Sequence, residues 1–441
     1  MSEREQHVLR KPGAHAVRTL AEYRREGGYK ALELALQTLS PAEVIERIGQ
    51  SGLHGRGGAG VPVVEKWSLV RGEDNYPKYV ICNAYDADPA SRISRTLLEQ
   101  YPHQVIEGIA LAAFAVGAEE AYLFTRSGYT AGIEAAREAL KEALSANLIG
   151  RNALGSRFSC TITLVAVDVG FMGGEETTLM EIIKGRRAMP QQRPPYPAIV
   201  GLWEKPTAIN SIETLANVPM IVAHGGAKFQ QGGIADSSPG TKLLTVYGPE
   251  PGAEPRLIEV ELGTTLRLAL RHAGMTLNER DVRGVAVGGP EGGVLPPSRF
   301  DTPIDYEALE EAGTILGSGT IEVLPAKTCM VAWANQRMEY LAGQSCGKCV
   351  PCRMGVKRIA GTLETIISDL ATPDDLKLLE EFAEYVPNGS LCGFGVHAPH
   401  PVVTAMRYFP DDFRLHIEEQ RCPTSTCVPL RVHRFVKKHV L

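Results

Sequence analysis

The sequence lacks the features of a membrane, secreted or nucleic-acid-binding protein. Its longest apolar run, Gly108 to Ala118, is far shorter than the roughly 20 residues that span a bilayer. Met1 to Gly13 is polar and mixed in charge, without the apolar stretch of a secretory signal peptide. The formal net charge of -5 provides no broad electrostatic basis for nucleic-acid binding. We therefore expect a cytoplasmic protein, either free or docked on the cytoplasmic side of a membrane complex.

Repeats and low-complexity segments are also absent, and a disulfide framework is not indicated. The 441 residues suffice for two to four domains, each able to bury its own core. The nine cysteines are odd in number and cluster late in the chain at short spacings. In an intracellular chain this pattern is typical of metal ligation rather than of disulfide bonds.

Strands and helices alternate in the first half of the chain, which predicts a parallel α/β sheet. Ser40-Pro41-Ala42-Glu43 has the residues of a capping box, so a helix is expected to begin there and to end near Gly52. The periodicity predicts further strands over 78–83, 121–125 and 158–169, and helices over 102–116, 131–148 and from about 175. Residues 1–28 are expected to form an irregular arm.

In the second half of the chain the predicted pattern of secondary structure changes twice. Short strands alternate with Gly and Pro turns over residues 240–323, around one helix near 265–273, which predicts a small α+β domain. From Cys329 onward the pattern is helical, with helices expected near 330–343, 350–370, 373–386 and 399–408.

Three cysteines lie within one tight turn. Cys346, Cys349 and Cys352 follow the spacing that suits three corners of a [4Fe–4S] cubane, which takes one thiolate per iron. Zinc is the rival metal, but it is usually bound by paired CxxC knuckles or with histidine. Cys392 follows two predicted helices, and an antiparallel pair of helices would return it to the first loop. We predict these four cysteines as the metal ligands.

The other five cysteines are less distinctive. Cys422 and Cys427 form a separate pair, either a zinc half-site completed by His416 or His397, or two free thiols. The remaining three lie on apolar segments and are expected to be small core residues; they are Cys82, Cys160 and Cys329.

A glycine-dense loop over residues 51–62 is the first candidate ligand-binding element. Its glycines let backbone N–H groups approach a phosphate or a flat ring, and Arg56 and the following Lys66 add positive charge. The loop has neither the Gly-Lys-Ser/Thr ending of a Walker loop nor a clean G-x-G-x-x-G after a strand. Taken alone, it is equally consistent with a mobile surface turn.

Polar residues also follow other strands, where ligands of α/β sheets bind. Asn83 begins a polar loop, and the segment 210–214 supplies short polar side chains. Gly174, Glu175 and Glu176 lie at a strand-to-helix junction, where a helix N-terminus favours anions. The two glutamates are equally suited to be ordinary helix-start residues.

Taken together, these elements resemble the flavoprotein subunit of respiratory complex I and of the related NAD-linked hydrogenases and formate dehydrogenases. The resemblance covers about residues 30–415, and its motifs agree in order and spacing. They are SGLHGRGGAGVP, YVICNAYDADP, PHQVIEGIALAAFAVGA, GGEETTLMEIIKGRRAMP, RPPYPAIVGLWEKPTAINSIETLAN, SCGKCVPCR and SLCGFG.

The resemblance implies an α/β Rossmann-like FMN domain, a ubiquitin-like β-grasp domain and a helical bundle that carries a [4Fe–4S] cluster. The expected boundaries are an N-terminal arm over 1–28, the FMN/NADH domain over 29–238, the β-grasp domain over 239–325, the helical domain over 326–420 and a tail over 421–441. The family works with a small thioredoxin-like [2Fe–2S] subunit and a larger hydrogenase, formate dehydrogenase or respiratory assembly.

The resemblance also implies an electron-entry subunit that oxidises NADH or NADPH at FMN by hydride transfer and passes single electrons to the cluster. The flavin carries out this chemistry, so no side chain is assigned as a catalytic acid or base. The residues implied to bind FMN or the dinucleotide are Gly55, Arg56, Gly57, Gly58, Gly60, Lys66, Asn83, Asp86, Asp88, Gly174, Glu175, Glu176, Arg193, Tyr196, Asn210, Ser211 and Thr214.

The chain departs from the family pattern in the dinucleotide part of the site. Val61 and Leu69 stand where the family usually has phenylalanines that are thought to stack on adenine, although Tyr196 offers one aromatic face. Asp88 replaces a glutamate, and Arg193 replaces a lysine with altered geometry.

Two further departures fall near the expected flavin. Tyr85 stands where the family has a small acid, and Phe171-Met172-Gly173-Gly174 replaces the usual Tyr-x-Cys-Gly. One interpretation is a remodelled pocket that still takes NADH or NADPH. The alternative is an electron-relay or scaffold paralogue that uses another donor or acceptor, and a zinc-stabilised binding module is a third hypothesis.

Overall fold

The computed structural model describes residues 8–9, 16–235, 237–276, 278–368 and 370–427. Most of the predicted tail over 421–441, from residue 428 onward, lies outside the described residues. The chain divides into two compact units: the first runs to Thr245 and includes Leu257–Thr264, and the second comprises Val246–Arg256 and the chain from Thr265 onward. None of the helices in the described residues is long and apolar enough to cross a membrane.

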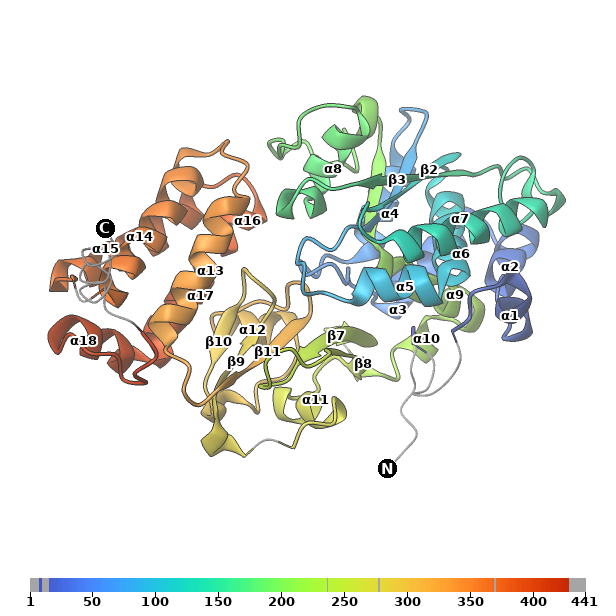
Figure 1. The fold of residues 1–441 in the computed structure, drawn as a ribbon. Helices are drawn as coiled ribbons and strands as arrows, with labels where there is room; N and C mark the ends of the chain where they lie inside the picture. Colours follow the sequence, from blue (N-terminus) through green and yellow to red (C-terminus); the bar gives the residue numbers. More distant parts are fainter. Residues whose placement is uncertain (1–7, 10–15, 236, 277, 369, 428–441) are drawn as a thin grey trace. The chain divides into compact units, whose positions relative to one another are not determined.

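The first unit is built on a parallel sheet, as predicted. Its four strands lie in the order β3-β2-β1-β4, and each neighbouring pair is parallel. Figure 1 labels β2 and β3 of this sheet. The strands are β1 (Tyr79–Ala84), β2 (Glu120–Arg126), β3 (Thr161–Val167) and β4 (Thr207–Ser211).

Side chains of β1 alternate between two apolar cores. Val80 and Cys82 face the larger core, which contains helices α6 (Pro102–Val116) and α9 (Ile212–His224). Tyr79 and Ile81 face the smaller core, which contains residues of α8 (Glu176–Ile183). Strand β1 is therefore buried along most of its length, as is typical of a central strand in a parallel sheet, whereas the edge strand β3 is only partly buried.

Helix α6 packs very closely against α9. A Cβ atom added at Gly108 would lie 2.1 Å from the carbonyl oxygen of Leu215, so the two backbones can approach only because residue 108 has no side chain.

The helix predicted to begin at Ser40-Pro41 is confirmed as α3 (Pro41–Ser51), where Ser40 and Glu43 form a reciprocal capping box.

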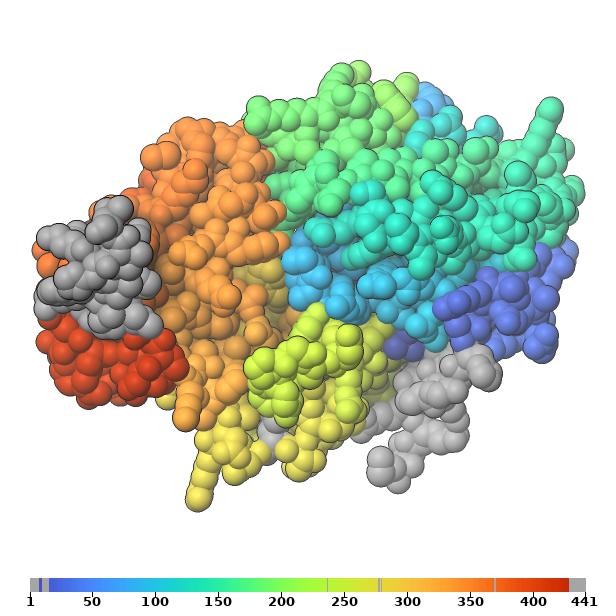
Figure 2. Space-filling model, in the orientation of Figure 1, coloured from blue at the N-terminus to red at the C-terminus, as the bar shows by residue number. Residues whose placement is uncertain are grey.

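The remaining helices of the first unit pack around this core. In Figure 2 the residues of this unit are coloured blue through green and lie side by side. The remaining helices are α1 (Leu20–Arg25), α2 (Lys30–Thr38), α4 (Val63–Gly72), α5 (Ile93–Gln100), α7 (Thr130–Ser145) and α10 (Gly226–Phe229). The expectation of an irregular arm was wrong over α1, where Thr19 and Glu22 form a second capping box. That signal is present in the sequence and was overlooked.

Short elements complete the first unit. They are the 3-10 turns η1 (Ala153–Gly155), η2 (Phe171–Gly174) and η3 (Leu202–Glu204), the antiparallel pair β5 (Gly233–Ile234) and β6 (Ser238–Pro239), and most of β7 (Thr241–Tyr247) and β8 (Arg256–Glu261).

The second unit combines a small antiparallel sheet with a helical region. Strand β9 (Val282–Val287) pairs with β10 (Gly293–Leu295) and with β11 (Thr320–Pro325). Four short elements accompany the strands: α11 (Leu266–His272), η4 (Glu279–Asp281), η5 (Pro297–Arg299) and α12 (Tyr306–Glu311). The helix predicted near 265–273 is confirmed as α11.

The four helical segments predicted after Cys329 are also present. They correspond to α13 (Met330–Gln344), η6 with α14 (Pro351–Gly355 and Val356–Ile367), α15 (Pro373–Asn388) and α17 (His400–Tyr408). Two short helices were not predicted, α16 (Gly393–His397) and α18 (Pro410–Glu418). The bundle is joined to the antiparallel sheet, because the Thr404 hydroxyl of α17 accepts a hydrogen bond of 2.9 Å from the backbone N–H of Val294 in β10.

Candidate functional site

The predicted binding residues of the first unit gather at the carboxyl edge of the parallel sheet. The chain passes from β1 through β2 to β3 on one side and then returns to place β4 on the other side of β1. Such a reversal of strand order opens a crevice at the carboxyl ends of the strands, where α/β proteins bind ligands. Asn83 at the end of β1 is in register with Ser211 at the end of β4.

The glycine loop lies beside this crevice, between α3 and α4. It is closed at its base, because the Gly55 N–H donates to the Val61 carbonyl over 2.8 Å. Gly58 and Gly60 have φ values of +110° and +64°, a region that side-chain-bearing residues rarely adopt. A Cβ added at Gly57 would lie 3.4 Å from the Cβ of Ser211, so the loop approaches the start of α9 closely.

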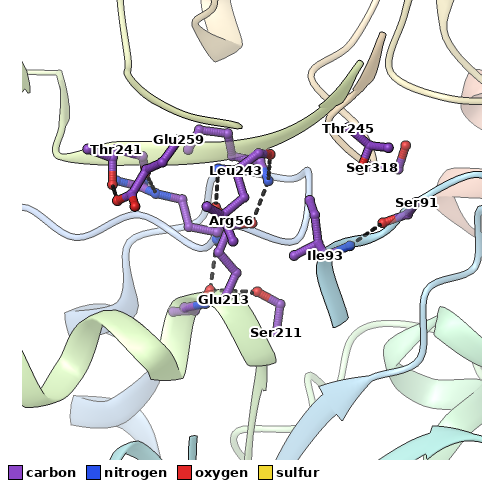
Figure 3. Close-up of polar contacts among 12 residues, drawn as sticks. Arg56, Ser91, Ile93, Ser211, Glu213, Thr241, Leu243, Thr245, Glu259 and Ser318 are labelled. Carbon is purple, nitrogen blue, oxygen red and sulfur yellow. Dashed lines mark hydrogen bonds and ion pairs between the residues drawn. The ribbon is translucent and has the colours of Figure 1, made fainter. Parts of the chain in front are cut away.

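Arg56 anchors this loop from within. Its side chain is only 2% exposed and donates hydrogen bonds of 2.8, 3.0 and 2.6 Å to the carbonyls of Thr241, His54 and Pro239. Arg56 and Thr241 are labelled in Figure 3. The Arg56 backbone N–H donates to the Thr214 hydroxyl over 2.8 Å. The guanidinium therefore fastens the loop to residues 239–241, and direct contact of Arg56 with a ligand stays a prediction.

A buried ion pair supports the same region. Lys242 donates to the Glu213 carboxylate, which also accepts a bond of 2.7 Å from the Leu243 N–H (Figure 3). Lys242 was not singled out from the sequence, although a lysine inside the apolar segment TKLLTVY was a usable signal. Because Glu213 is in the first turn of α9, the pair joins that helix to β7.

Three short polar residues lie where β4 passes into α9. The Ser211 hydroxyl caps the helix by accepting from the Thr214 N–H over 3.2 Å, and the two hydroxyl oxygens are 2.8 Å apart. The Asn210 side-chain oxygen accepts from the Trp67 indole N–H over 2.9 Å. Because Ser211 lies against Gly57, the start of α9 faces the glycine loop, and a helix N-terminus favours an anion.

Four predicted charged residues form one network at the start of α8. Lys66 donates to Glu176 over 2.6 Å and to the Ile209 carbonyl over 2.7 Å. Arg193 lies 3.6 Å from Glu176 and 3.9 Å from Glu175. Glu175 is the N-cap of α8, since its carboxylate accepts from the Thr178 N–H over 2.7 Å. The interpretation of Glu175 as a helix-start residue is confirmed, and its contact with a ligand stays a prediction.

The acidic residues Asp86 and Asp88 of the loop after β1 are fixed by hydrogen bonds from neighbouring residues. Asp86 accepts hydrogen bonds of 2.8 Å from the Ser94 hydroxyl and 3.0 Å from the Tyr129 hydroxyl, and burial raises the pKa of its carboxyl group. Asp88 is buried and accepts from the Ala90 N–H over 2.8 Å. Asn83 donates to the Gly174 carbonyl over 2.9 Å, which ties β1 to η2.

Three apolar or aromatic residues of the predicted dinucleotide region are well exposed. Val61 in the glycine loop is 48% exposed, Leu69 on α4 is 50% exposed and Tyr196 in the proline-rich loop is 56% exposed. They offer surface for a flat ligand, but only Tyr196 offers a ring.

The second unit brings together the two cysteine segments that were predicted to meet. The Leu391 N–H donates to the Cys349 sulfur over 3.4 Å, and a Cβ added at Gly395 would lie 3.4 Å from that of Cys352. The predicted return of the 392 loop is therefore confirmed. Gly347 has a φ of +80°, as expected for the tight turn, and Cys352 lies in the single π-helical turn η6.

A second group of cysteine and histidine side chains, which could hold a metal ion, corrects one prediction. Cys329 was expected to be an inert core cysteine, but its sulfur lies 3.4 Å from Nε2 of His416. With Cys422 and Cys427 these residues form a set whose ligand atoms all lie within 4.8 Å of one another. Contact with Cys427 and His416 lowers the pKa of the Cys329 thiol to about 4, although burial opposes it. Cys82 and Cys160 are buried core residues, as predicted.

The family comparisons match both sites. Residues 48–220 match the Nuo51 FMN-binding domain, and residues 332–416 match the NADH-ubiquinone oxidoreductase-F iron-sulfur binding region. The sequence is 39% identical over 405 residues to the F 2 subunit of NADH-quinone oxidoreductase in Rhizobium meliloti (strain 1021), an alignment covering 92% of this chain and 96% of the relative. The chain belongs to the F-type family of NADH-quinone oxidoreductase subunits.

Other members of the F-type family belong to hydrogenases. NADP-reducing hydrogenase subunit HndC of Solidesulfovibrio fructosivorans is 37% identical, over 91% of this chain and 81% of that relative. A crystal structure of NAD+-reducing [NiFe]-hydrogenase in the H2-reduced state has a TM-score of 0.79 at 30% identity, covering 94% of this chain and 68% of that one. This F-type homologue is thus a flavoprotein subunit of an oxidoreductase, with FMN and a [4Fe–4S] cluster as its cofactors.

Proposed function

We propose that this F-type homologue takes electrons from NADH or NADPH at FMN, with the flavin held at the carboxyl edge of the β3-β2-β1-β4 sheet. One observation carries the proposal: the glycine loop and the N-terminus of α9 meet where the strand order reverses, with Gly57 against Ser211. Backbone N–H groups and a helix terminus at such a point suit a phosphate-bearing ligand. When bound, FMN converts a two-electron hydride transfer into single-electron transfers.

The chain's own residues would bind and orient these ligands. Gly55, Gly57, Gly58 and Gly60 would let the flavin approach the backbone, while Arg56 would hold the loop rigid from behind. Ser211, Thr214 and the start of α9 would face the phosphate, and Lys66 would add charge beside them. The other predicted binding residues would complete the flavin and dinucleotide surfaces; they are Asn83, Asp86, Asp88, Gly174, Glu175, Glu176, Arg193, Tyr196 and Asn210.

The cluster ligands in this proposal are Cys346, Cys349, Cys352 and Cys392. All four lie inside the matched iron-sulfur region, which spans residues 332–416. Their donor chemistry fits a cubane, since four thiolates can each bind one iron. Burial and the neighbouring Cys346 and Cys349 raise the pKa of the Cys352 thiol, although Ser345 opposes them, so binding of iron would offset a real cost of gathering thiolates.

The partner subunits and the domain boundaries are also part of the proposal. The relatives are named as subunits of a quinone oxidoreductase and of a hydrogenase, which supports a multi-subunit assembly. We expect a small thioredoxin-like [2Fe–2S] subunit and a larger catalytic or respiratory partner in the cytoplasm. The domain boundaries given above, with a β-grasp fold over 239–325, remain part of this proposal and rest on the changes of sequence pattern.

The alternative function is an electron relay that does not use a nicotinamide. The exposed aliphatic residues Val61 and Leu69 favour it, because they remove two expected aromatic contacts with adenine. An anaerobic titration separates the two functions. If the flavin band bleaches on addition of NADH or NADPH, the proposed function holds; an unbleached flavin beside an intact cluster would instead support the relay.

The cluster assignment has its own test. Replacing Cys392 with serine should remove the [4Fe–4S] signal in electron paramagnetic resonance and most of the iron, while the FMN content stays at its normal level. The matched control is Cys160→Ala, a buried cysteine of the first unit, which should change neither. A Cys392→Ser protein with full iron content would contradict the ligand set.

A further inference from the structure

Four metal-ligating side chains of the second unit converge away from the proposed cluster cysteines. They come from three segments: Cys329 precedes α13, His416 is in the last turn of α18, and Cys422 and Cys427 lie in the turn that follows α18. Cys329 and His416 are 2% and 1% exposed. The family match over 332–416 contains none of these three cysteines and reaches only His416, its last residue.

The distances fit one small tetrahedral ion. Nε2 of His416 lies 3.4 Å from the sulfur of Cys329 and 3.9 Å from that of Cys427. Tetrahedral zinc, with bonds of about 2.3 Å to sulfur and about 2.0 Å to nitrogen, would set sulfur–nitrogen separations near ~3.6 Å. All four ligand atoms lie within 4.8 Å of one another, so they surround a space that a single ion could occupy.

The donor set selects zinc over an iron–sulfur cluster. Three thiolates and one imidazole form a closed set of the kind found in structural zinc sites, with no position left for a substrate. A cubane would need its four ligands spread over four different irons. His416 directs Nε2 toward the sulfurs, while its buried Nδ1 has no hydrogen-bond partner among the described residues.

We propose that Cys329, His416, Cys422 and Cys427 bind one structural zinc ion. The ion would fasten the segment after α18 to the start of α13. Asp412 supports the same junction, because its carboxylate accepts from the Met330 N–H over 2.9 Å and pairs with Arg283. The 15 residues of α13 span about 22 Å, so the zinc and the cluster loop would lie at opposite ends of one helix.

The role that follows is structural, because the ion would stabilise the end of α13 that lies away from the cluster loop. Zinc binding links α18 and the chain beyond it to α13, and α13 leads directly into the loop that carries Cys346. Structural zinc sites of this kind contribute folding energy directly. The ion itself has no redox chemistry, so it would not take part in electron transfer.

The test is metal analysis of the full chain, purified anaerobically without added zinc. We expect one zinc per chain in addition to the iron of the cluster. In the double variant Cys422→Ser/Cys427→Ser the zinc should be lost while iron and FMN stay unchanged, and the control Cys160→Ala should keep all three. Zinc that persists in the double variant would overturn the proposal, and so would loss of iron in place of zinc.

A second measurement covers the case in which the double variant fails to fold. Zinc-edge X-ray absorption of the unmodified protein should show about three sulfur neighbours and one nitrogen neighbour. His416→Cys should keep the metal and convert the shell to four sulfurs, because a set of four thiolates also suits zinc. A zinc shell of oxygen and nitrogen only, or one unchanged by His416→Cys, would refute the site.

Discussion

Gly173 lies directly against the ring of Tyr85: a Cβ atom at residue 173 would come within 2.6 Å of the ring carbon Cζ. Tyr85 is buried, and its hydroxyl donates to the Gly170 carbonyl over 2.7 Å. The family usually has a small acid at the first position and a cysteine at the second. The two departures therefore compensate for each other, because the glycine provides the space that the tyrosine ring fills.

This relationship predicts that the effects of substitutions at residues 85 and 173 on stability are coupled. Gly173→Ala should lower the free energy of unfolding by about 1–3 kcal/mol, because the new methyl group overpacks the ring. Adding Tyr85→Ala should remove part of that penalty, giving a coupling energy in a double-mutant cycle measured by chemical denaturation, while Val169, 2.8 Å from the added Cβ, accounts for the rest. Gly128→Ala is the control, since a Cβ there meets nothing within 4 Å. Additive effects of the two changes would contradict the compensation.

A second prediction concerns Arg56. Arg56→Lys keeps the positive charge but loses the fork that bonds the carbonyls of Thr241 and Pro239. We expect a loss of about 1–3 kcal/mol in stability and at least about tenfold weaker FMN binding, because the glycine loop loosens. FMN release followed by fluorescence measures this, with the exposed Arg157→Lys as control. Unchanged flavin affinity would show that the positive charge of residue 56, and not its hydrogen bonds, supports FMN binding.

A third prediction concerns acid stability of the second unit. Burial, with the neighbouring His397, lowers the pKa of His400 to about 4, whereas an unfolded histidine titrates near 6.5. The unfolded chain therefore binds a proton first, and stability present above pH 6.5 is lost as the pH falls toward about 4.

The full loss attributable to His400 is on the order of 3 kcal/mol. His400→Gln should flatten this part of the pH dependence of unfolding, followed by chemical denaturation monitored at successive pH values. The matched control is His224→Gln, because His224 ends α9 in the first unit and its side chain is exposed. An identical pH dependence in the unmodified protein and in His400→Gln would rule out this origin.

The fourth prediction concerns the dinucleotide surface. Val61→Phe and Leu69→Phe should each lower the KM for NADH by about two- to tenfold, since an aromatic contact contributes about 0.5–1.5 kcal/mol. Leu144→Phe, on the exposed face of α7, should leave the KM unchanged. If the two substitutions have no effect on KM, the adenine of the substrate lies elsewhere.

Much of the fold followed from local sequence patterns. The capping residues Ser40 and Glu43 placed the start of α3, and apolar periodicity placed α6 with its bounds. The cysteine triplet and the glycine loop were recognisable for the same reason, because each lies within a dozen consecutive residues. The short helices α16 and α18 were missed, because a few residues carry too little periodicity to be distinguished from a loop.

The sequence by itself determined the types of element, the cofactor class and the candidate cysteines of the cluster, since these depend on residues that are near one another along the chain. Only the tertiary structure decided that Cys329 meets His416, 87 residues later, that the Arg56 guanidinium turns inward, and that Gly173 makes room for Tyr85. Contacts of this kind arise from packing of distant segments, and no local propensity encodes which side chains will then be neighbours.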